Sequence, residues 1–523
     1  MLAIVTSHMR SVAGVVSALA ALAAAPARQM PMRVTIDAGI VEGARDPSHS
    51  GVVAFKGIPY AAPPVGASRW TPPRPPAPWT GIRSARELGP VCPQSDRLPM
   101  VMKRLVTALG GDPSTVRPLG AMSEDCLSLN VWTSTAGTAT KQPVMVWLHG
   151  GALAFGSGSD EAAALAPAGV VVVTVNYRLG LLGALAHPAL AAESPHDASG
   201  NYGLLDQIAA LRWVQRNISA FGGDPRRVTV FGHSSGGASV LELLASPLAR
   251  GLVHRAIAQS SGLAESLARQ AAEAKGLEVA ARLGAPAEGP LPALRALAPE
   301  RLVAVGGPFD RVTDGWVLPA QVPAVLTTPG NGVPLIIGAT ANEAVIFQLP
   351  DDRRSYLSMI EESGPEWRER LLARYPAASD AEARAAMIRL MTDRDFVCPA
   401  RYIAARRTSP TWLYLVSAPP AENPAATRLG AYHGADVRFL FGVEFGAPMG
   451  EAGRRVGDAM RRYWVRFAAA GDPNDAGAPI WPRYASPERR HLDFGETVAT
   501  ATGFGDGRCE VFDEIWDRAY RRR

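Results

Sequence analysis

The sequence predicts an α/β fold with a large, mostly parallel central sheet that is flanked by helices. Apolar runs such as 170–175 lack polar alternation, which is typical of strands buried on both faces. Segments with apolar residues at helical spacing separate these runs, and 204–218 is the clearest example. Strand–helix alternation of this kind predicts a parallel sheet covered by helices.

The predicted elements follow in order along the chain. A Gly- and Pro-rich stretch at 39–93 contains short β-like pieces. Further strands are predicted at 143–148, 170–175, 228–231, 256–258, 333–337 and 412–416, and helices at 204–218 and 236–244. Residues 348–410 are rich in Arg, Glu and Ala, which predicts a helical insertion over the sheet.

Composition excludes several classes of protein. Of the 523 residues, 47% are hydrophobic and 19% are charged, which is the balance of a globular chain and not of a disordered one. The net charge is +5, but arginines supply most of it along the whole chain, and the only compact basic run is 521–523. Without a basic stripe, a nucleic-acid partner is not expected.

The first 27 residues predict a signal peptide. Arg10 precedes an uncharged apolar run at 12–25, and Ala25-Pro26-Ala27 resembles an A-x-A cleavage site. The run is shorter than the ~20 residues needed to span a bilayer, although an N-terminal anchor or a buried helix stays open, as does a start at Met9. With no second long apolar stretch, we expect an exported protein, secreted or periplasmic, without a stable membrane span.

Four cysteines agree with an oxidising compartment: Cys92, Cys126, Cys398 and Cys509. An even number favours disulfides, but four cysteines allow three pairings and their spacing does not choose among them. No C-x-x-C spacing occurs, so the sequence predicts neither a zinc site nor a redox motif.

The strongest chemical motif is Gly232-His233-Ser234-Ser235-Gly236, a G-x-S-x-G pattern between a predicted strand and a predicted helix. This context is the one required of a nucleophile elbow, in which a strained turn raises a serine hydroxyl above the sheet. The glycines are needed because side chains there would clash. We therefore expect Ser234 to be a nucleophile, against the alternative of an ordinary Gly-rich β–α turn.

A base and an acid for this serine follow from chain order, which in α/β-hydrolases is Ser, then acid, then His. Only His433 and His491 lie far enough beyond Ser234, and His491 begins a predicted strand, so His433 is the predicted base. Glu343 comes just after a predicted strand and is the predicted acid, which would orient His433. Asp314 is the alternative, but it fits a turn better.

An oxyanion hole is predicted at His149-Gly150-Gly151-Ala152, which follows the strand at 144–148 and resembles the HGGG-type motif of esterases. We expect the N–H groups of Gly151, Ala152 and Ser235 to point at the developing oxyanion. One such donor contributes roughly 3 kcal/mol of transition-state stabilisation.

Together these motifs resemble the type-B carboxylesterase family, which includes cholinesterases and bacterial p-nitrobenzyl esterases. The resemblance covers the chain from about residue 33 onward. Its segments are 123–131, 176–180, 200–207, 217–225, 309–319 and 338–347 in addition to the elbow.

The resemblance implies several assignments that spacing leaves open. It implies that Glu343 and His433 are the triad acid and base, and that disulfides join Cys92 to Cys126 and Cys398 to Cys509. It also suggests buried structural ion pairs between Arg178 and Asp206 and between Arg69 and Glu124, which are costly to break.

This chain departs from the family pattern at the elbow. The family usually has Glu-Ser-Ala, whereas this sequence has His233-Ser234-Ser235. A histidine can donate where the glutamate would accept, while Ser235 keeps the backbone N–H of the oxyanion hole. Leu153 replaces a common Phe. The segment 92–126 contains no aromatic residue for a cation–π site, so a choline-ester specialist is not expected.

The sequence thus predicts one α/β-hydrolase domain at 28–523, because the motifs of a single site span 149 to 433, and not the three domains that length alone favours. We expect a serine carboxylesterase that forms an acyl-enzyme on a small-molecule ester and needs no metal or organic cofactor. Carbamates, amides or bulky polyester-like substrates are alternatives, as is a noncatalytic adhesion or binding role. The sequence leaves open whether the protein is a monomer or a dimer.

Overall fold

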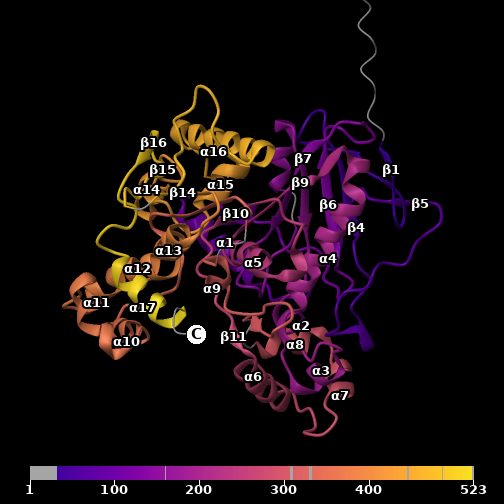
Figure 1. Ribbon diagram of the computed structural model, residues 1–523, viewed down its shortest axis with the longest axis horizontal. Helices are drawn as coiled ribbons and strands as arrows, with labels where there is room; N and C mark the ends of the chain where they lie inside the picture. The colour runs from indigo at the N-terminus through magenta and orange to yellow at the C-terminus, as the bar shows by residue number, and fades with distance from the viewer. Residues whose placement is uncertain are drawn as a thin grey trace, which may run out of the picture.

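A mixed sheet organises the molecule, and within the described part of the chain it has 11 strands. Figure 1 shows it running through the centre of the molecule with helices around it. The predicted signal peptide at 1–27 lies outside the described residues. The structure is a computed structural model that describes residues 32–158, 161–306, 310–328, 332–444, 447–485 and 487–520.

The strands cross the sheet in an order that differs from their order in the chain. From one edge to the other they are β16 (Val498–Ala501), β15 (His491–Phe494), β14 (Thr411–Val416), β13 (Leu335–Thr340), β10 (Arg255–Gln259), β9 (Gly223–His233), β7 (Gln142–Leu148), β8 (Val171–Val175), β6 (Ser128–Thr133), β4 (Val53–Pro59) and β3 (Ala44–Arg45). All neighbours from β15 to β8 are parallel. The remaining pairs are antiparallel, so the predicted mostly parallel sheet is confirmed.

The other elements surround this sheet. Two small sheets contain β1 (Arg33–Ile36), β2 (Gly39–Glu42) and β5 (Ile82–Ser84), and β11 (Leu267–Ala268) with β12 (Val312–Thr313). The helices are α1 (Arg97–Ala108), α2 (Gly180–Ala184), α3 (Pro188–Glu193), α4 (Tyr202–Asn217), α5 (Ser235–Ala245), α6 (Arg269–Arg282), α7 (Leu291–Arg295), α8 (Pro299–Val305), α9 (Val322–Leu326), α10 (Arg353–Glu361), α11 (Arg368–Arg374), α12 (Asp380–Thr392), α13 (Cys398–Arg406), α14 (Pro424–Leu429), α15 (Ala435–Phe441), α16 (Glu451–Ala470) and α17 (Glu510–Tyr520).

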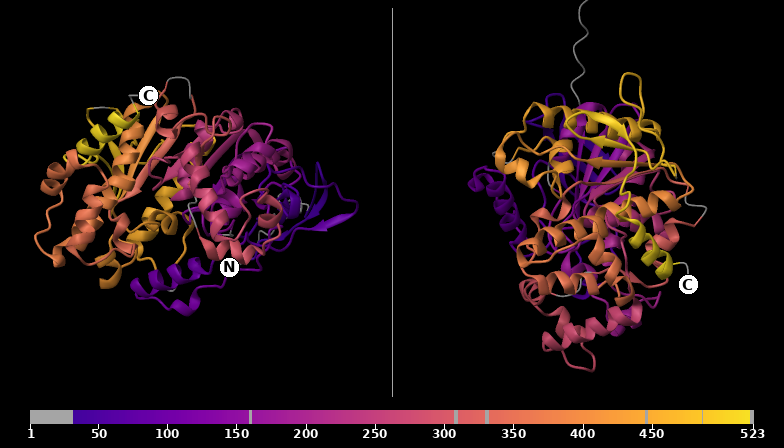
Figure 2. Two further views of the ribbon diagram at one scale, coloured as in Figure 1. Left: turned by 90° about the horizontal axis from the view of Figure 1, so that it is seen from below. Right: turned by 90° about the vertical axis from the view of Figure 1, so that its left-hand side faces the viewer.

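The unbroken apolar runs become strands because both faces of the sheet are buried. Along β7, Val144 and Val146 pack in one hydrophobic cluster while Met145 and Trp147 pack in the cluster on the opposite face. This alternation follows from the two-residue period of a strand. Helices α4 and α5 contribute to the first cluster and α16 to the second. Figure 2 shows the twisted sheet with helices on both sides.

The region predicted as a helical insertion holds helices α10 to α13. Between α12 and α13 the chain makes one π-helical turn, Asp393–Val397. Figure 1 places α10, α11 and α12 together at one side of the molecule, beside α17. The C-terminal helix therefore packs on a segment that lies more than 100 residues earlier in the chain.

Cross-links and buried charges lie where the family resemblance implies them. Disulfides join Cys92 to Cys126 and Cys398 to Cys509. The Arg178–Asp206 ion pair has N···O 2.7 Å and both side chains are buried. The Arg69–Glu124 pair has N···O 2.5 Å and is almost as well covered. Among the described residues, no helix is long and apolar enough to cross a membrane.

Candidate active site

Ser234 lies at the junction of β9 and α5, in a conformation that few side chains adopt. Its φ is 58° and its ψ is −126°, and a positive φ in a non-glycine residue is uncommon and strained. The flanking glycines permit this turn. A Cβ on Gly232 would lie 2.5 Å from the carbonyl oxygen of Gly236, and one on Gly236 would lie 2.1 Å from that of Leu148. The G-x-S-x-G spacing is therefore a steric requirement of this corner.

The surroundings of Ser234 leave its hydroxyl uncommitted. The backbone N–H of Ser234 donates to the carbonyl oxygen of Gln259 at 2.8 Å, which fixes the turn against β10. Gly150 lies on the other side, where a Cβ would come within 3.1 Å of the Ser234 Cβ. Within the described ranges the Ser234 side chain makes no hydrogen bond, so its Oγ is available to a base and a substrate.

Glu343 and His433 form a direct pair. The His433 Nδ1 lies 2.5 Å from Glu343 Oε2, and the glutamate is fully buried. The second carboxylate oxygen accepts hydrogen bonds of 2.6 Å from the Ser260 hydroxyl and from the Thr340 N–H. A carboxylate acceptor assigns the proton to Nδ1 of His433, which leaves Nε2 as the acceptor nitrogen.

These groups meet because β9, β10 and β13 are parallel neighbours. Ser234, Ser260 and Glu343 follow the carboxyl ends of these three strands, and such ends share one edge of a sheet. The predicted alternative acid, Asp314, instead holds a turn. One of its oxygens accepts the backbone N–H groups of residues 316, 317 and 318.

The loop after β7 presents backbone N–H groups to the same edge. Gly151, Ala152 and Leu153 all have positive φ, and a Cβ on Gly151 would lie 2.0 Å from the carbonyl oxygen of Phe155. The N–H of Leu153 donates to Ser235 Oγ at 3.2 Å. Within the described ranges, the N–H groups of Gly151, Ala152 and Ser235 have no acceptor in the protein. They are therefore free to bind an anionic oxygen.

His149 supports this loop as a neutral, buried group. Its ring stacks on Tyr177 with centroids 4.3 Å apart, and the Tyr177 hydroxyl donates to the His149 carbonyl oxygen at 2.6 Å. Burial lowers the pKa of His149 to about 4, so the ring is neutral at physiological pH.

His233, which stands where the family usually has glutamate, lies against the base. The rings of His233 and His433 are 4.4 Å apart. Burial, followed by the charge of His433, lowers the pKa of His233 well below its usual value. Its Nε2 is 3.9 Å from an oxygen of the buried Asp436, which is too long for a hydrogen bond.

A buried polar network holds Asp436. Its carboxylate accepts from Gln259 Nε2 and from the Tyr414 hydroxyl, each at 2.9 Å. Trp464 Nε1 completes the network by donating to Gln259 Oε1 at 3.3 Å. Burial raises the pKa of Asp436, and these donors act in the opposite direction.

Two phenylalanines cover His433 on its apolar side. The rings of Phe396 and Phe347 lie 4.8 and 5.3 Å from the imidazole. Phe396 comes from the π-helical turn of the insertion, so this segment forms part of the wall of the site. Among the described residues, no group of three or more His, Cys, Asp or Glu side chains could hold a metal ion.

Sequence reasoning missed the groups that lie against the predicted triad residues. Ser260 follows a predicted strand and Asp436 lies three residues after His433, but nothing in either spacing indicates a partner. The side chain of Ser235 is a further example, because only its backbone N–H entered the prediction. His491 lies in β15, as predicted, with its ring 5.0 Å from that of Phe504 and away from the site.

Comparisons with known proteins cover most of the chain and identify its family. The sequence model described as the carboxylesterase family matches residues 30–512. A fumonisin B1 esterase of Sphingopyxis macrogoltabida is 38% identical over 501 residues, covering 89% of this chain and 87% of that protein. A para-nitrobenzyl esterase of Bacillus subtilis is 34% identical, covering 88% and 94% respectively. A solved PNB esterase structure has a TM-score of 0.78 at 32% identity and covers 92% of this chain and 99% of that chain.

Proposed function

The chain belongs to the carboxylesterase family and hydrolyses carboxylic esters, and we propose that it does so through an acyl-enzyme on Ser234. In this proposal His433 is the general base and acid, and Glu343 orients it. The N–H groups of Gly151, Ala152 and Ser235 stabilise the oxyanion. The observation that carries the proposal is the 2.5 Å contact between Glu343 and His433 at the sheet edge where Ser234 stands.

The acylation step uses each group once. Ser234 Oγ attacks the ester carbonyl carbon while His433 Nε2 takes the hydroxyl proton. The carbonyl π electrons move onto oxygen, where the free N–H groups stabilise the negative charge. The tetrahedral intermediate collapses by breaking the bond to the alcohol oxygen, which receives the proton from His433. Glu343 keeps its hydrogen bond to Nδ1 and stabilises the transient imidazolium.

Deacylation repeats the sequence with water. His433 Nε2 accepts a proton from water as the water oxygen attacks the acyl carbon, and the same N–H groups stabilise the second oxyanion. The Ser234 oxygen then leaves and regains its proton from His433. The products are a carboxylic acid and free enzyme, and no step needs a metal or an organic cofactor.

The experiment is to compare wild type with Ser234→Ala in hydrolysis of p-nitrophenyl acetate and butyrate. We expect kcat to fall about 10⁴-fold or more, because the nucleophile is gone. Ser48→Ala, at an exposed serine, is the matched control and should react like wild type. Labelling by a fluorophosphonate probe should disappear only in Ser234→Ala. Equal rates in wild type and Ser234→Ala would refute the assignment.

We also propose that the protein is exported, secreted or periplasmic, after cleavage of residues 1–27, and that residues 28–523 form one domain with a helical insertion around 348–410. The two disulfides support export, because such bonds persist in oxidising compartments. N-terminal sequencing of the mature protein from the producing cell tests the cleavage. A mature chain that retains residues 1–27 would contradict it.

A further inference from the structure

A cavity of about 240 Å³ lies beside the loop that carries Glu343. Ala341 and Asn342, which directly precede Glu343, form one wall of it. Three arginines from separate elements contribute to the lining, at the ends of α11 and α12 and just before α17: Arg374, Arg389 and Arg508.

The charges around this cavity are not balanced. Asp393 is the only acid in the lining, and its carboxylate takes an ion pair of 3.0 Å from Arg508 and a hydrogen bond of 3.0 Å from the Tyr375 hydroxyl. Arg374 and Arg389 make no ion pair with any described residue. Three guanidinium groups and one carboxylate therefore leave a formal charge of +2 around the cavity.

The arginines face the interior of the cavity as well as solvent. Burial raises the pKa of Asp393, and the charges of Arg508, Arg374 and Arg389 all act in the opposite direction, which places all three near this carboxylate. Arg374 and Arg389 are exposed, so a ligand from solvent can reach them. Arginine binds carboxylate and phosphate oxygens with two parallel N–H donors.

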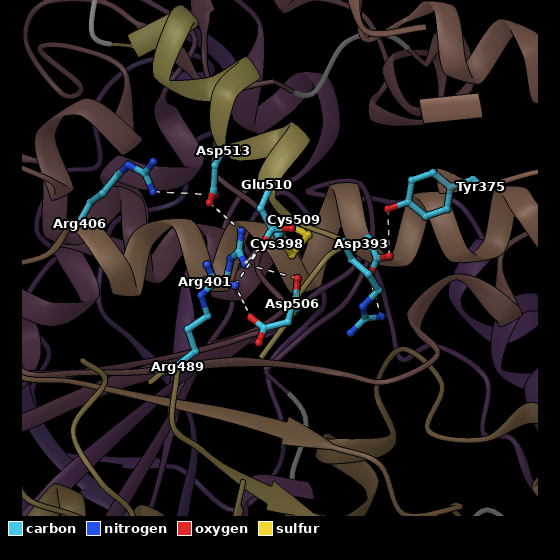
Figure 3. Close-up of a disulfide and its surroundings, with 12 residues drawn as sticks. Tyr375, Asp393, Cys398, Arg401, Arg406, Arg489, Asp506, Cys509, Glu510 and Asp513 are labelled. Carbon is cyan, nitrogen blue, oxygen red and sulfur yellow. Dashed lines mark hydrogen bonds and ion pairs between the residues drawn. A yellow bond between two sulfur atoms is a disulfide. The ribbon is translucent and has the colours of Figure 1, made fainter. Parts of the chain in front are cut away.

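A covalent bond and a π-helical turn fix the geometry of this cavity. Asp393 begins the π turn, Cys398 follows that turn at the start of α13, and Cys398 is bonded to Cys509, the neighbour of Arg508. Figure 3 shows the Tyr375 hydroxyl pointing at Asp393 near this disulfide. π turns inside helices often occur at functional sites. The two walls that carry Asp393 and Arg508 are thus held together before any ligand arrives.

We propose that this cavity binds a small dianion that carries carboxylate or phosphate groups, with Arg374 and Arg389 as its main ligands. Arg508 is partly neutralised by Asp393 and closes one side. The shared chemistry is that of an oxyanion with two negative charges, either free in solution or attached to an ester substrate.

Binding at this place would act on the catalytic acid through its loop. The Asn342 N–H donates to the Ala431 carbonyl oxygen at 2.9 Å, and the Asn342 side-chain amide donates to the Leu429 carbonyl oxygen at 2.6 Å. These two bonds tie the Glu343 loop to the segment before His433. Thr392, also in the lining, accepts the Ala344 N–H at 3.1 Å. A ligand on the arginines therefore contacts residues that hold both members of the Glu343–His433 pair.

The test is calorimetric titration of the full disulfide-bonded chain with succinate and with inorganic phosphate at pH 7.5 and constant ionic strength. Arg374→Gln/Arg389→Gln should lose at least about tenfold in affinity, because charge-assisted bonds to the anion disappear. The control is Arg104→Gln/Arg301→Gln, which removes two positive charges from exposed positions on α1 and α8 and should bind as wild type does. Absence of binding to wild type, or equal affinity in both double variants, overturns the proposal.

A kinetic comparison separates the two sources of the anion. The probe is the mono-p-nitrophenyl ester of butane-1,2,4-tricarboxylate, which keeps two free carboxylates. The ratio of its kcat/KM to that for p-nitrophenyl butyrate is measured in wild type and in Arg374→Gln/Arg389→Gln. If the anion belongs to the substrate, this ratio falls about tenfold or more in the variant. If the anion is free, the ratio stays constant while succinate affinity is lost. Calorimetry does not depend on turnover, so a failed triad assignment would leave the binding result intact.

Discussion

The sheet edge that carries the proposed triad and the C-terminal layer, formed by α11, α13 and α17, hold their acidic side chains in opposite ways. At the edge, Glu343 is fully buried and accepts hydrogen bonds from a hydroxyl, a backbone N–H and an imidazole. In the C-terminal layer, Arg401 lies between Glu510 and Asp513 at 3.1 and 2.7 Å. Figure 3 shows these ion pairs gathered around the Cys398–Cys509 disulfide.

This difference teaches how to distinguish a working carboxylate from a structural one. A permanent guanidinium partner neutralises Asp513, so little of its charge remains for another cation. Glu343 has neutral donors, and in the proposed mechanism its charge stays available to the imidazolium that forms on His433. We therefore expect changes at the sheet edge to alter rates more than stability, and changes in the C-terminal layer to do the reverse.

The largest expected effect is the loss of activity in Glu343→Gln. An amide cannot hold the His433 Nδ1 proton as a carboxylate does, so kcat should fall about 10³- to 10⁴-fold while the folded state survives. The measurement is kcat for p-nitrophenyl butyrate together with urea unfolding. Asp314→Asn, at the alternative acid, should keep its kcat. A large loss there and a small loss at Glu343 would reverse the assignment.

The C-terminal layer should show the opposite behaviour when its disulfide is removed. The Cys398–Cys509 bond spans 111 residues, so Cys398→Ser/Cys509→Ser should lose about 4–5 kcal/mol of unfolding free energy through the released loop. Most of kcat/KM should remain under folding conditions. Arg370→Gln, which removes an exposed ion pair with Glu514 in the same layer, should cost well under about 1 kcal/mol. A double variant with wild-type stability but little activity would contradict the comparison.

The pH dependence of stability provides a third test, at His149, which supports the loop beside the sheet edge and has no proposed catalytic role. The pKa of His149 is about 4 in the folded chain against 6.5 for an ordinary histidine, so below pH 6.5 the unfolded chain binds the proton and the folded chain does not. Stability therefore falls as the pH drops from 6.5 to about 4, by about 3 kcal/mol from this group.

His149→Gln isolates this contribution. The variant loses ring stacking at every pH. Its glutamine does not titrate, so unfolding takes up no proton at this position. Urea unfolding at pH 8 and pH 5 should therefore show that wild type exceeds the variant in unfolding free energy by less at pH 5 than at pH 8. Parallel stability profiles would show that His149 is not the group responsible.

The acid limb of the kcat/KM profile should respond to the charge at position 233. His233→Glu restores the residue usual in the family and places a carboxylate near the His433 ring. The carboxylate stabilises the imidazolium, so as the pH falls the neutral base is lost at a higher pH than in wild type. We expect the limb to move up by about one pH unit. Asp436 and Glu343 are the other charged groups near this position. His233→Gln, which is neutral, should leave the limb in place, and identical shifts in both variants would exclude an effect of charge.

The smallest expected effect concerns the side chain of Ser235. Ser235→Ala keeps the backbone N–H but releases the Leu153 N–H from its 3.2 Å bond, so the oxyanion loop loses one anchor of about 1 kcal/mol. We expect kcat to fall several-fold with little change in KM, because the loop acts on the transition state. A change confined to KM would assign Ser235 to substrate binding instead.

The sequence predicted much of the fold because its strongest patterns are local. The apolar runs of β7 and β8 need no partner to be recognised, since burial on both faces removes polar alternation. The elbow around Ser234 was equally visible, because glycines are required wherever a Cβ would meet the backbone. His433 and Glu343 followed from chain order and from the family resemblance.

Only the tertiary structure decided which groups lie next to the proposed triad. Ser260 reaches Glu343 because β10 lies between β9 and β13, and strand order cannot be read from strand composition. The arginines of the proposed anion site come from the ends of α11 and α12 and from the turn before α17, which share no motif, and the disulfide of Cys398 and Cys509 brings the last of them into place. By itself the sequence determined the parallel strands of the sheet, the elbow and the chemical type of each residue, but it did not predict the antiparallel strands β6 and β16. Contacts between residues far apart in the chain depend on packing, and packing determined how the base, the acid and their neighbours are held.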